Sequence, residues 1–377
     1  MRTSLKQYQY KLFSNNIEED DIVAVREVLQ TGVLSRGQAT ENFEKTFAQY
    51  VGKKYAIAVS SGTAALHLAI KALGWREGDE VLTSPFTFIS SASCLLYEKI
   101  KPIFIDIDKS DLNLNAFLIE KNLDKKVKGI ILPYIFGATP NSPGQQKILK
   151  KIKLPIIEDA CEAVGRASKN TSPKLARSIK VYSFFNNKPL TCGEGGMVAT
   201  DDEKIAAKVK SLRDQGRIIG KKWADKISLG YNYRLTEMQA ALATNQLKKL
   251  DQRLQERVNL AKTYYQELRG LKDLELPPIK SLGRSWFVFY VLVNNPEKRD
   301  RLYRELNKRG IECGINYFLP LYRFAYLKKY VDQKKLKSLF PNTEEASSKI
   351  LVLPIHNQLI KSDIVAICNE LKKILNI

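Results

Sequence analysis

Short runs of β-branched and other apolar residues alternate with amphipathic segments through the first two thirds of the sequence. This alternation is typical of parallel strands joined by helical crossovers, so we predict an α/β fold with a mostly parallel sheet flanked by helices. Residues 61–73 (SGTAALHLAIKAL) carry apolar residues at helical spacing after a Ser-Gly-Thr start, which predicts a capped helix. The expected strands are residues 55–60, 80–83, 102–107, 129–135, 154–158, 180–184 and 197–200.

The pattern changes from about Thr236, where a long helical stretch begins that is broken near Gly270. The sequence beyond this stretch is typical of a small α+β domain. Its expected strand and two helices are residues 286–293, residues 299–310 and the segment after residue 363. We therefore predict a large domain over residues 1–245, with the N-terminal segment included, and a small C-terminal domain over residues 246–377.

The composition is that of a folded chain, with 377 residues, 44% hydrophobic and 27% charged. This length allows about two domains and a sizeable core, and the composition excludes wholesale disorder. No apolar run reaches the roughly 18 residues that a membrane helix needs, and the N-terminus lacks the continuous apolar region of a signal peptide. We expect a cytoplasmic protein without a membrane partner.

The sequence gives little support for a metal site or a disulfide framework. The five cysteines are scattered without CxxC pairing, and there are two histidines, so we expect reduced thiols and no metal. The formal net charge of +21 suggests a polyanion as partner. However, lysine pairs recur along the whole chain, which favours solvated helix faces, and we expect no nucleic acid partner.

Two segments that follow predicted strands carry residues suited to chemistry. Lys188 lies in SFFNNKPLTCGEGGMVAT, where a desolvated amine could form imines; taken alone, it could equally be a surface lysine before a glycine-rich turn. The segment IEDACEAVG brings Glu158 and Asp159 to the carboxyl end of a strand, where ligands of α/β sheets bind. Such a carboxylate could bind a metal, hold a ribose hydroxyl, pair with a protonated ring nitrogen, or only cap a helix.

Three further segments add an anion site and aromatic faces. VSSGTAAL (59–66) forms a strand-to-helix turn that favours a phosphate, although helix capping alone would explain it, and it matches neither a Walker A loop nor GxGxxG. SPFTF (84–88) offers Phe86 and Phe88 as ring faces or as core residues, and LGYNYRLTEMQAA is a Tyr- and Asn-rich turn or an ordinary loop. Together, an anion site, an acid, an aromatic face and an activatable lysine are what pyridoxal 5′-phosphate requires, so we expect this cofactor.

These segments resemble the DegT/StrS-type family of nucleotide-sugar aminotransferases, which are fold-type I pyridoxal-phosphate enzymes. The resemblance runs from GVLSRG (32–37) to LPIH near the C-terminus, and the SF…K…GEGG and NYR…QAA segments are its most specific parts. It implies a fold-type I transferase, in which a large cofactor-binding domain with a mostly parallel sheet is followed by a small α+β domain.

Carried over residue by residue, the resemblance makes Lys188 the Schiff-base lysine and Asp159 the partner of the protonated pyridine nitrogen. Phe88 corresponds to the aromatic residue that stacks on the cofactor ring. Asn232 corresponds to a residue that reaches the phosphate from the neighbouring subunit, which implies a homodimer with shared active sites. The remaining cofactor positions are Gly62, Thr63 and Ser183 at the phosphate and Glu162 at the phenolic oxygen.

The chain also departs from the family pattern. Many relatives have Gln at the position of Glu162, where an ionised carboxylate would repel the cofactor's phenolate unless a proton is shared. Tyr134 stands where a histidine or an acid is frequent, and residues 165–178 lack the usual glycine-rich pattern. The INYFLPLY segment has Asn316 and Tyr322 in place of two histidines. The sequence therefore leaves the substrate contacts open.

The resemblance implies transfer of an amino group, with L-glutamate as the expected donor, to a keto group at C3 or C4 of a nucleotide-linked deoxysugar. Lys188 would act as general base and acid while Asp159 keeps the ring an electron sink, and the product would enter polysaccharide, glycan or metabolite biosynthesis. One alternative is a sugar dehydratase using the same cofactor, but such relatives replace the lysine with histidine. The other is a non-catalytic polyanion-binding protein on the same fold, which the Lys188 and Asp159 pair disfavours.

Overall fold

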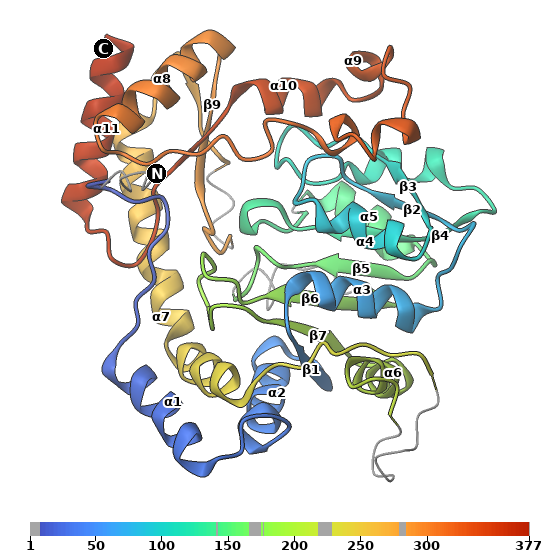
Figure 1. The fold of residues 1–377 in the computed structure, drawn as a ribbon. Helices are drawn as coiled ribbons and strands as arrows, with labels where there is room; N and C mark the ends of the chain where they lie inside the picture. Colours follow the sequence, from blue (N-terminus) through green and yellow to red (C-terminus); the bar gives the residue numbers. More distant parts are fainter. Residues whose placement is uncertain are drawn as a thin grey trace, which may run out of the picture.

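The structure is a computed structural model that describes residues 8–140, 142–165, 175, 177–217, 228–278 and 284–376. A seven-stranded sheet lies at its centre with helices on both faces, and a smaller three-stranded sheet lies in the C-terminal part (Figure 1). This is the α/β architecture expected from the alternation of apolar runs and amphipathic segments. Each strand that the sequence predicts is present, with ends that differ by a few residues.

The large sheet has the strand order β1-β7-β6-β5-β4-β2-β3. β7 runs antiparallel to both of its neighbours, whereas the pairs from β6 through β3 are parallel, so the sheet is mostly parallel. The strands are β1 (Tyr55–Val59), β2 (Glu80–Thr83), β3 (Lys101–Phe104), β4 (Val127–Pro133), β5 (Ile156–Asp159), β6 (Ser178–Ser183) and β7 (Gly196–Thr200).

Successive residues of each strand face opposite sides of the sheet, so both sides carry apolar residues. On β1, Ile57 and Val59 pack into the core beneath α3 and α6, whereas Ala56 and Ala58 pack into the core beneath α2 and α7. The helices that cover the sheet or follow its strands are α2 (Gln38–Val51), α3 (Gly62–Leu73), α4 (Ser90–Tyr97), α5 (Pro143–Lys151), α6 (Glu203–Arg213) and α7 (Glu237–Leu268).

Helix α3 begins where the sequence predicts a cap. The Ser61 hydroxyl accepts a hydrogen bond from the Ala64 amide at 3.1 Å, and the helix ends at Gly74, whose φ of 77° is the left-handed conformation common at helix ends. The serine cap fixes the first turn of α3 directly after β1. The backbone N–H groups of that turn therefore point away from the helix at the sheet edge.

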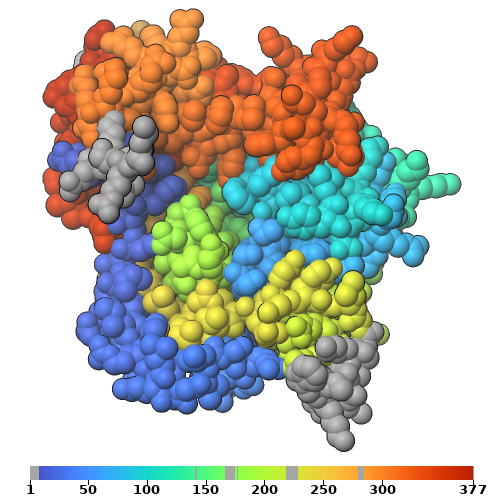
Figure 2. All heavy atoms as spheres, viewed as in Figure 1, coloured from blue at the N-terminus to red at the C-terminus, as the bar shows by residue number. Residues whose placement is uncertain are grey.

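The C-terminal part is built on an antiparallel sheet with the order β10-β9-β8. In the space-filling view its residues, coloured orange to red, rest on the part of the chain coloured cyan (Figure 2). A backbone hydrogen bond of 2.9 Å from Leu321 to Pro85 joins the two parts. The remaining elements are α1 (Glu19–Thr31), β8 (Leu274–Glu275), β9 (Phe289–Val293), α8 (Pro296–Lys308), α9 (Leu336–Leu339), α10 (Pro341–Lys349), β10 (Ile350–Leu353) and α11 (Lys361–Leu375). Short 3-10 turns lie at Ala116–Leu118, Glu120–Asn122, Ile135–Gly137, Leu321–Arg323 and Lys328–Tyr330.

Helix α7 connects the two parts without a break. Its first half packs against the large sheet through Leu250 and Leu254, and its second half packs against the small sheet through Val258 and Tyr264. The expected boundary between residues 245 and 246 falls inside this helix, and the division into domains stays a prediction. The chain near Tyr10 lies against the C-terminal part, since its amide donates to the Gly310 carbonyl at 3.0 Å.

A buried ion pair joins two central strands. Glu158 on β5 and Lys180 on β6 are partners in the strand register, with 3.4 Å between Oε2 and Nζ and side chains that are 0% and 7% exposed. The Tyr134 hydroxyl donates a hydrogen bond to the same carboxylate. Burial lowers the pKa of Lys180, and Glu158 opposes that shift by favouring the ammonium. The pair lies one residue before Asp159, so it stabilises the strand end on which that carboxylate sits.

We expect Lys180→Met to lower the free energy of unfolding by about 3 kcal/mol, because it removes the cation that faces a fully buried carboxylate. Urea denaturation of the variant measures this loss. The control is Lys99→Met, which removes the cation of an ion pair with Glu77 whose side chains are 72% and 71% exposed and should leave the midpoint unchanged. Equal midpoints for wild type and Lys180→Met would show that the buried pair is not stabilising.

Candidate active site

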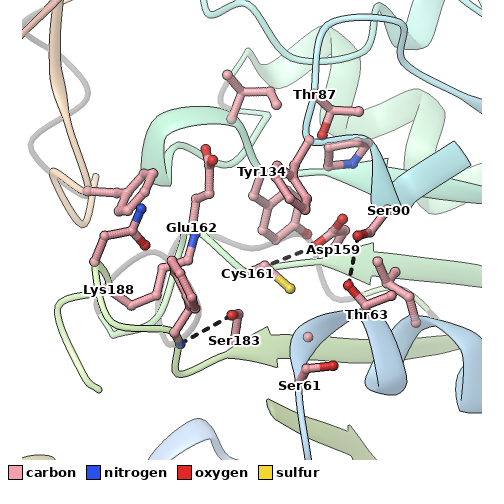
Figure 3. Close-up of a pocket in the computed structure, with 18 of the residues that line it drawn as sticks. Ser61, Thr63, Thr87, Ser90, Tyr134, Asp159, Cys161, Glu162, Ser183 and Lys188 are labelled. Atoms are coloured by element: carbon pink, nitrogen blue, oxygen red, sulfur yellow. Dashed lines mark hydrogen bonds between the residues drawn. The ribbon is translucent and has the colours of Figure 1, made fainter. Parts of the chain in front are cut away.

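A cavity of about 410 Å³ lies at the carboxyl ends of the parallel strands (Figure 3). Ligands of open α/β sheets bind at this edge, because strand ends and helix N-termini converge there. The C-terminal part contributes to the cavity wall through Phe287, Asn316 and Tyr317. Except for Asn232, the residues that the sequence predicts at the cofactor line this cavity, namely Gly62, Thr63, Phe88, Asp159, Glu162, Ser183 and Lys188.

Lys188 reaches the cavity from the loop between β6 and β7. Its amide donates a hydrogen bond to the Phe185 carbonyl at 2.9 Å. This bond closes a turn that directs the lysine back toward the sheet. The side-chain Nζ lies 4.0 Å from the centroid of the Phe287 ring, so the amine lies between the sheet edge and the C-terminal part.

Asp159 is the last residue of β5 and points into the same cavity (Figure 3). Its Oδ2 accepts a hydrogen bond from the Ser91 hydroxyl at 2.6 Å, and its Oδ1 accepts one from the Cys161 amide at 3.2 Å. These two donors fix the direction of the carboxylate, which is 7% exposed. Such a carboxylate is suited to hold a proton on a ring nitrogen.

Cys161 lies beside Asp159 and also lines the cavity. Burial raises the pKa of its thiol well above the usual range, Asp159 raises it further, and Lys188 partly opposes the shift. Because the thiolate is the nucleophilic form, this thiol is unreactive at neutral pH. It serves as part of the cavity wall.

The first turn of α3 and the end of β6 present groups that are suited to bind an anion. The Thr63 hydroxyl is 2.8 Å from the Ser90 hydroxyl, and the Ser183 hydroxyl accepts from the Phe185 amide at 3.4 Å. The N–H groups of the first turn have no acceptor within the helix, and the helix dipole favours a negative charge there. A Cβ at Gly62 would lie 2.9 Å from both Ser183 Cβ and Cys161 Sγ, so this first turn of α3 packs too closely against β6 for any residue larger than glycine.

Three predicted residues lie differently relative to the cavity, namely Phe88, Glu162 and Asn232. Phe88 is 60% exposed at the cavity, so one face of its ring is free to stack on a planar ligand. Glu162 is buried in the opposite part of the wall, where it accepts hydrogen bonds from the Phe136 amide and the Tyr317 hydroxyl. Asn232 is exposed and does not line the cavity of its own chain, and its expected contact with the neighbouring subunit stays a prediction.

Sequence reasoning missed several residues of the site. Ser91 orients Asp159, and Phe287 and Tyr317 contact Lys188 and Glu162 from the C-terminal part. The hydroxyl-rich stretch ISSAS after SPFTF was an available signal for Ser91. Tyr317 lies in the INYFLPLY segment, which the resemblance singled out without giving Tyr317 a role. No local signal identified Phe287, which reaches the site only through the tertiary fold.

Some expectations concern features that the described residues do not contain. The segment 165–178, which departs from the family's glycine-rich pattern, lies mostly outside the described residues. Within the part that is described, no three His, Cys, Asp or Glu side chains gather closely enough to hold a metal ion. No helix in that same part has both the length and the hydropathy to cross a membrane.

The cavity fits pyridoxal 5′-phosphate group by group. The first turn of α3 would hold the phosphate, Asp159 the ring nitrogen, Phe88 one ring face and Lys188 the aldehyde carbon. The start of α3 in the cavity wall, with Gly62 and Thr63 in its first turn, is the observation that supports the phosphate position most directly. Fold and site together define a fold-type I transferase that depends on pyridoxal phosphate.

The chain belongs to the DegT/DnrJ/EryC1/StrS aminotransferase family, whose model matches residues 15–372. It is thus a pyridoxal-phosphate-dependent sugar aminotransferase, as the resemblance in the sequence implied. It is 32% identical over 372 residues to the UDP-4-amino-4,6-dideoxy-N-acetyl-beta-L-altrosamine transaminase of Campylobacter jejuni, a match covering 95% of this chain and 97% of that protein.

Two solved structures show the same fold over nearly the whole chain. DesV of S. venezuelae, in complex with a ketimine intermediate, has a TM-score of 0.86 at 28% identity and matches 94% of this chain and 93% of its own. PseC of Helicobacter pylori, an aminotransferase involved in the biosynthesis of pseudoaminic acid, has a TM-score of 0.87 at 26% identity and matches 98% and 100%.

We expect Gly62→Ala to weaken binding of pyridoxal phosphate by about tenfold or more. The new methyl group would collide with Ser183 and Cys161 and shift the first turn of α3 away from the phosphate, whose hydrogen bonds are worth about 1.5–3 kcal/mol. Absorbance titration measures the dissociation constant. Gly74→Ala is the matched control at the other end of α3, where a Cβ meets nothing within 4 Å. It should cost about 1–2 kcal/mol of stability, because of the positive φ, and leave cofactor affinity unchanged. Wild-type affinity in Gly62→Ala would exclude a phosphate at this helix end.

Proposed function

We propose that the protein transfers an amino group from L-glutamate to a keto carbon, at C3 or C4, of a nucleotide-linked deoxysugar. The observation that supports this most strongly is the convergence of Lys188 and Asp159 on one cavity in a chain of this family. The name of the Campylobacter relative specifies a UDP-linked 4-amino-4,6-dideoxy sugar. A UDP-linked 4-keto-6-deoxy sugar is therefore the first substrate to test, and the product would enter polysaccharide, glycan or metabolite biosynthesis.

Each residue of the site would have its own role in the reaction. Bound pyridoxal phosphate supplies a carbonyl carbon that takes up the amino group and a ring that accepts electrons. The Lys188 amine takes the proton from the α-carbon of the donor and returns a proton to the sugar carbon in the second half of the reaction. Asp159, fixed by Ser91, keeps the ring nitrogen protonated. L-glutamate leaves as 2-oxoglutarate before the sugar binds, so the two substrates use the same cavity in turn.

The cavity wall separates these steps from water. Phe287 and Tyr317 cover Lys188 and Glu162 from the side of the C-terminal part. Exclusion of water strengthens the interaction of Asp159 with a charged ring and limits proton loss to solvent. The mouth of the cavity carries Phe88 and Phe185, which are 60% and 43% exposed, and offers apolar surface to a sugar ring or a neighbouring subunit.

Two other functions on this fold have weaker support. A sugar dehydratase of this family would carry histidine where this chain has Lys188, and Lys188 lies in the cavity. A non-catalytic polyanion-binding protein is suggested by the net charge of +21. That function would leave the convergence of Lys188, Asp159 and the anion-binding turn of α3 without a role.

We expect Lys188→Ala to lower turnover by a factor of about 100 to 10,000, the range that a positioned acid or base contributes. The fold should stay intact. Mass spectrometry of the amino sugar formed from a UDP-linked keto sugar and L-glutamate measures turnover, and thermal unfolding tests the fold. Lys308→Ala, on the exposed face of α8, is the control and should behave as wild type. Retained steady-state transamination in Lys188→Ala would overturn the assignment of this lysine.

We also propose a homodimer with shared active sites, in which Asn232 of each chain reaches the phosphate bound by the other. Asn232→Ala should then raise the dissociation constant of pyridoxal phosphate by about tenfold, the effect of losing one hydrogen bond to a charged group. Cofactor titration at protein concentrations where light scattering shows a dimer measures it. Unchanged cofactor affinity would remove Asn232 from the site.

A further inference from the structure

Glu162 is held by the protein at both oxygens of its carboxyl group. Oε2 accepts a hydrogen bond from the Phe136 amide at 2.7 Å, and Oε1 accepts one from the Tyr317 hydroxyl at 2.5 Å. The side chain is 8% exposed and forms part of the cavity wall near Lys188 and Asp159. Each oxygen keeps a second lone-pair position, so the carboxyl group can carry a proton while it accepts both hydrogen bonds.

The two donors reach Glu162 from strained backbone. Phe136 and Tyr317 have φ values of 52° and 64°, a region that bulky residues rarely adopt. Their rings stack at a centroid distance of 5.5 Å and an interplanar angle of 21°, and Phe86 meets the edge of both. Strain of this kind persists where packing enforces it, and it is common at functional sites. Here it brings two hydrogen-bond donors onto one carboxyl group.

The backbone of Glu162 is tied to the C-terminal part as well. Its carbonyl accepts a hydrogen bond from the Ser285 hydroxyl at 2.7 Å, and the Ser285 amide donates to the Gly137 carbonyl at 3.0 Å. Ser285 and Tyr317 therefore hold Glu162 from two separate segments of the C-terminal part. The carboxyl has little freedom to turn away from the cavity.

We propose that Glu162 acts as a neutral acid that donates a hydrogen bond to the phenolic oxygen of the cofactor, and that Tyr317 is a positioning residue that orients the carboxyl group for this donation. In this way an acid takes the place of the amide that many relatives carry. The proposal depends on the cofactor and on no particular sugar, so it can fail while the proposed function holds.

The electrostatics of the cavity favour the neutral form. Burial raises the pKa of Glu162, and Asp159 raises it further, whereas Lys188 and the hydrogen bonds from Tyr317 and Phe136 lower it without cancelling the shift. A phenolate oxygen placed beside the carboxyl would add a second negative charge and raise its pKa again. Tyr317 keeps its own proton, because burial raises the pKa of its hydroxyl well above the usual range.

The sign of the pH dependence follows from these shifts. Below the pKa of Glu162 the carboxyl is neutral and can donate to the phenolic oxygen, and above it the carboxylate repels that oxygen. Cofactor affinity should therefore fall by up to tenfold per pH unit as the pH rises above the pKa of Glu162. We call this falling part of the pH profile the limb. The other titratable groups facing the carboxyl are Lys188, Asp159, Cys161 and Tyr317.

The test compares the dissociation constant of pyridoxal phosphate against pH in wild type and variants. Glu162→Gln should abolish the limb and keep affinity close to that of wild type at low pH, because the amide donates at every pH. Glu194→Gln is the matched control, since it replaces another carboxyl that lines the cavity and should leave the limb in place. A limb that survives in Glu162→Gln would overturn the proposal.

Tyr317→Phe separates positioning from a purely structural role. Loss of this hydroxyl should weaken cofactor binding several-fold at low pH and also move the limb to higher pH, because the hydroxyl favours the ionised carboxyl. A structural defect would weaken binding without moving the limb, and that result would contradict the role of Tyr317. Tyr326→Phe, an exposed tyrosine in the same part of the chain, should behave as wild type.

Infrared spectroscopy supplies a readout that needs no turnover and no folded Tyr317 variant. Wild-type protein with bound cofactor should show the carbonyl band of a protonated carboxyl group, and this band should be missing in Glu162→Gln. A difference spectrum that contains only a carboxylate band would show that Glu162 is ionised and would overturn the proposal.

Discussion

The site depends on one carboxylate held at the end of a buried strand. Asp159 closes β5, and its orientation is set by the Ser91 hydroxyl from α4 and by the amide of Cys161. The same strand carries the ion pair of Glu158 and Lys180 on its other side, which ties β5 to β6. Because the parallel strands end at one edge, Asp159, the loop that carries Lys188 and the first turn of α3 converge there. A cofactor with a phosphate, a basic ring nitrogen and an aldehyde matches these three groups.

The C-terminal part does more than cover this cavity. It contributes Phe287 against Lys188, and Tyr317 and Ser285 against Glu162, so two groups that line the cavity are contacted from outside the large sheet. Helix α7 carries the connection, since its two halves belong to different cores. A small shift of the C-terminal part would therefore change the surroundings of the lysine and of the acid together.

The sequence predicted the strands and the residues of the cavity because both depend on local pattern. Apolar runs and the capping serine determine where β1 ends and α3 begins, so the turn over residues 59–66 was found from local pattern, and the resemblance then supplied the roles of Gly62 and Thr63. The resemblance to the aminotransferase family supplied the roles of Lys188 and Asp159, which neither residue type reveals alone. Both lie in the cavity.

Other features could not be predicted, because they arise from contacts between segments far apart in the chain. The hydrogen bond between Tyr317 and Glu162 joins residues 155 positions apart, and the contact of Phe287 with Lys188 depends on how the C-terminal part lies on the sheet. The left-handed conformations of Phe136 and Tyr317 have no sequence signal, since neither is a glycine or an asparagine. Asn232 stays a prediction because its expected contact involves a second chain.

The most direct test of the account is the absorbance spectrum of the purified protein with pyridoxal phosphate, recorded before L-glutamate, after L-glutamate, and again after a nucleotide-linked keto sugar. The account predicts a visible band of bound cofactor that L-glutamate removes and the keto sugar restores. A protein that gives no cofactor band, or a band that neither the amino acid nor the sugar changes, would contradict it.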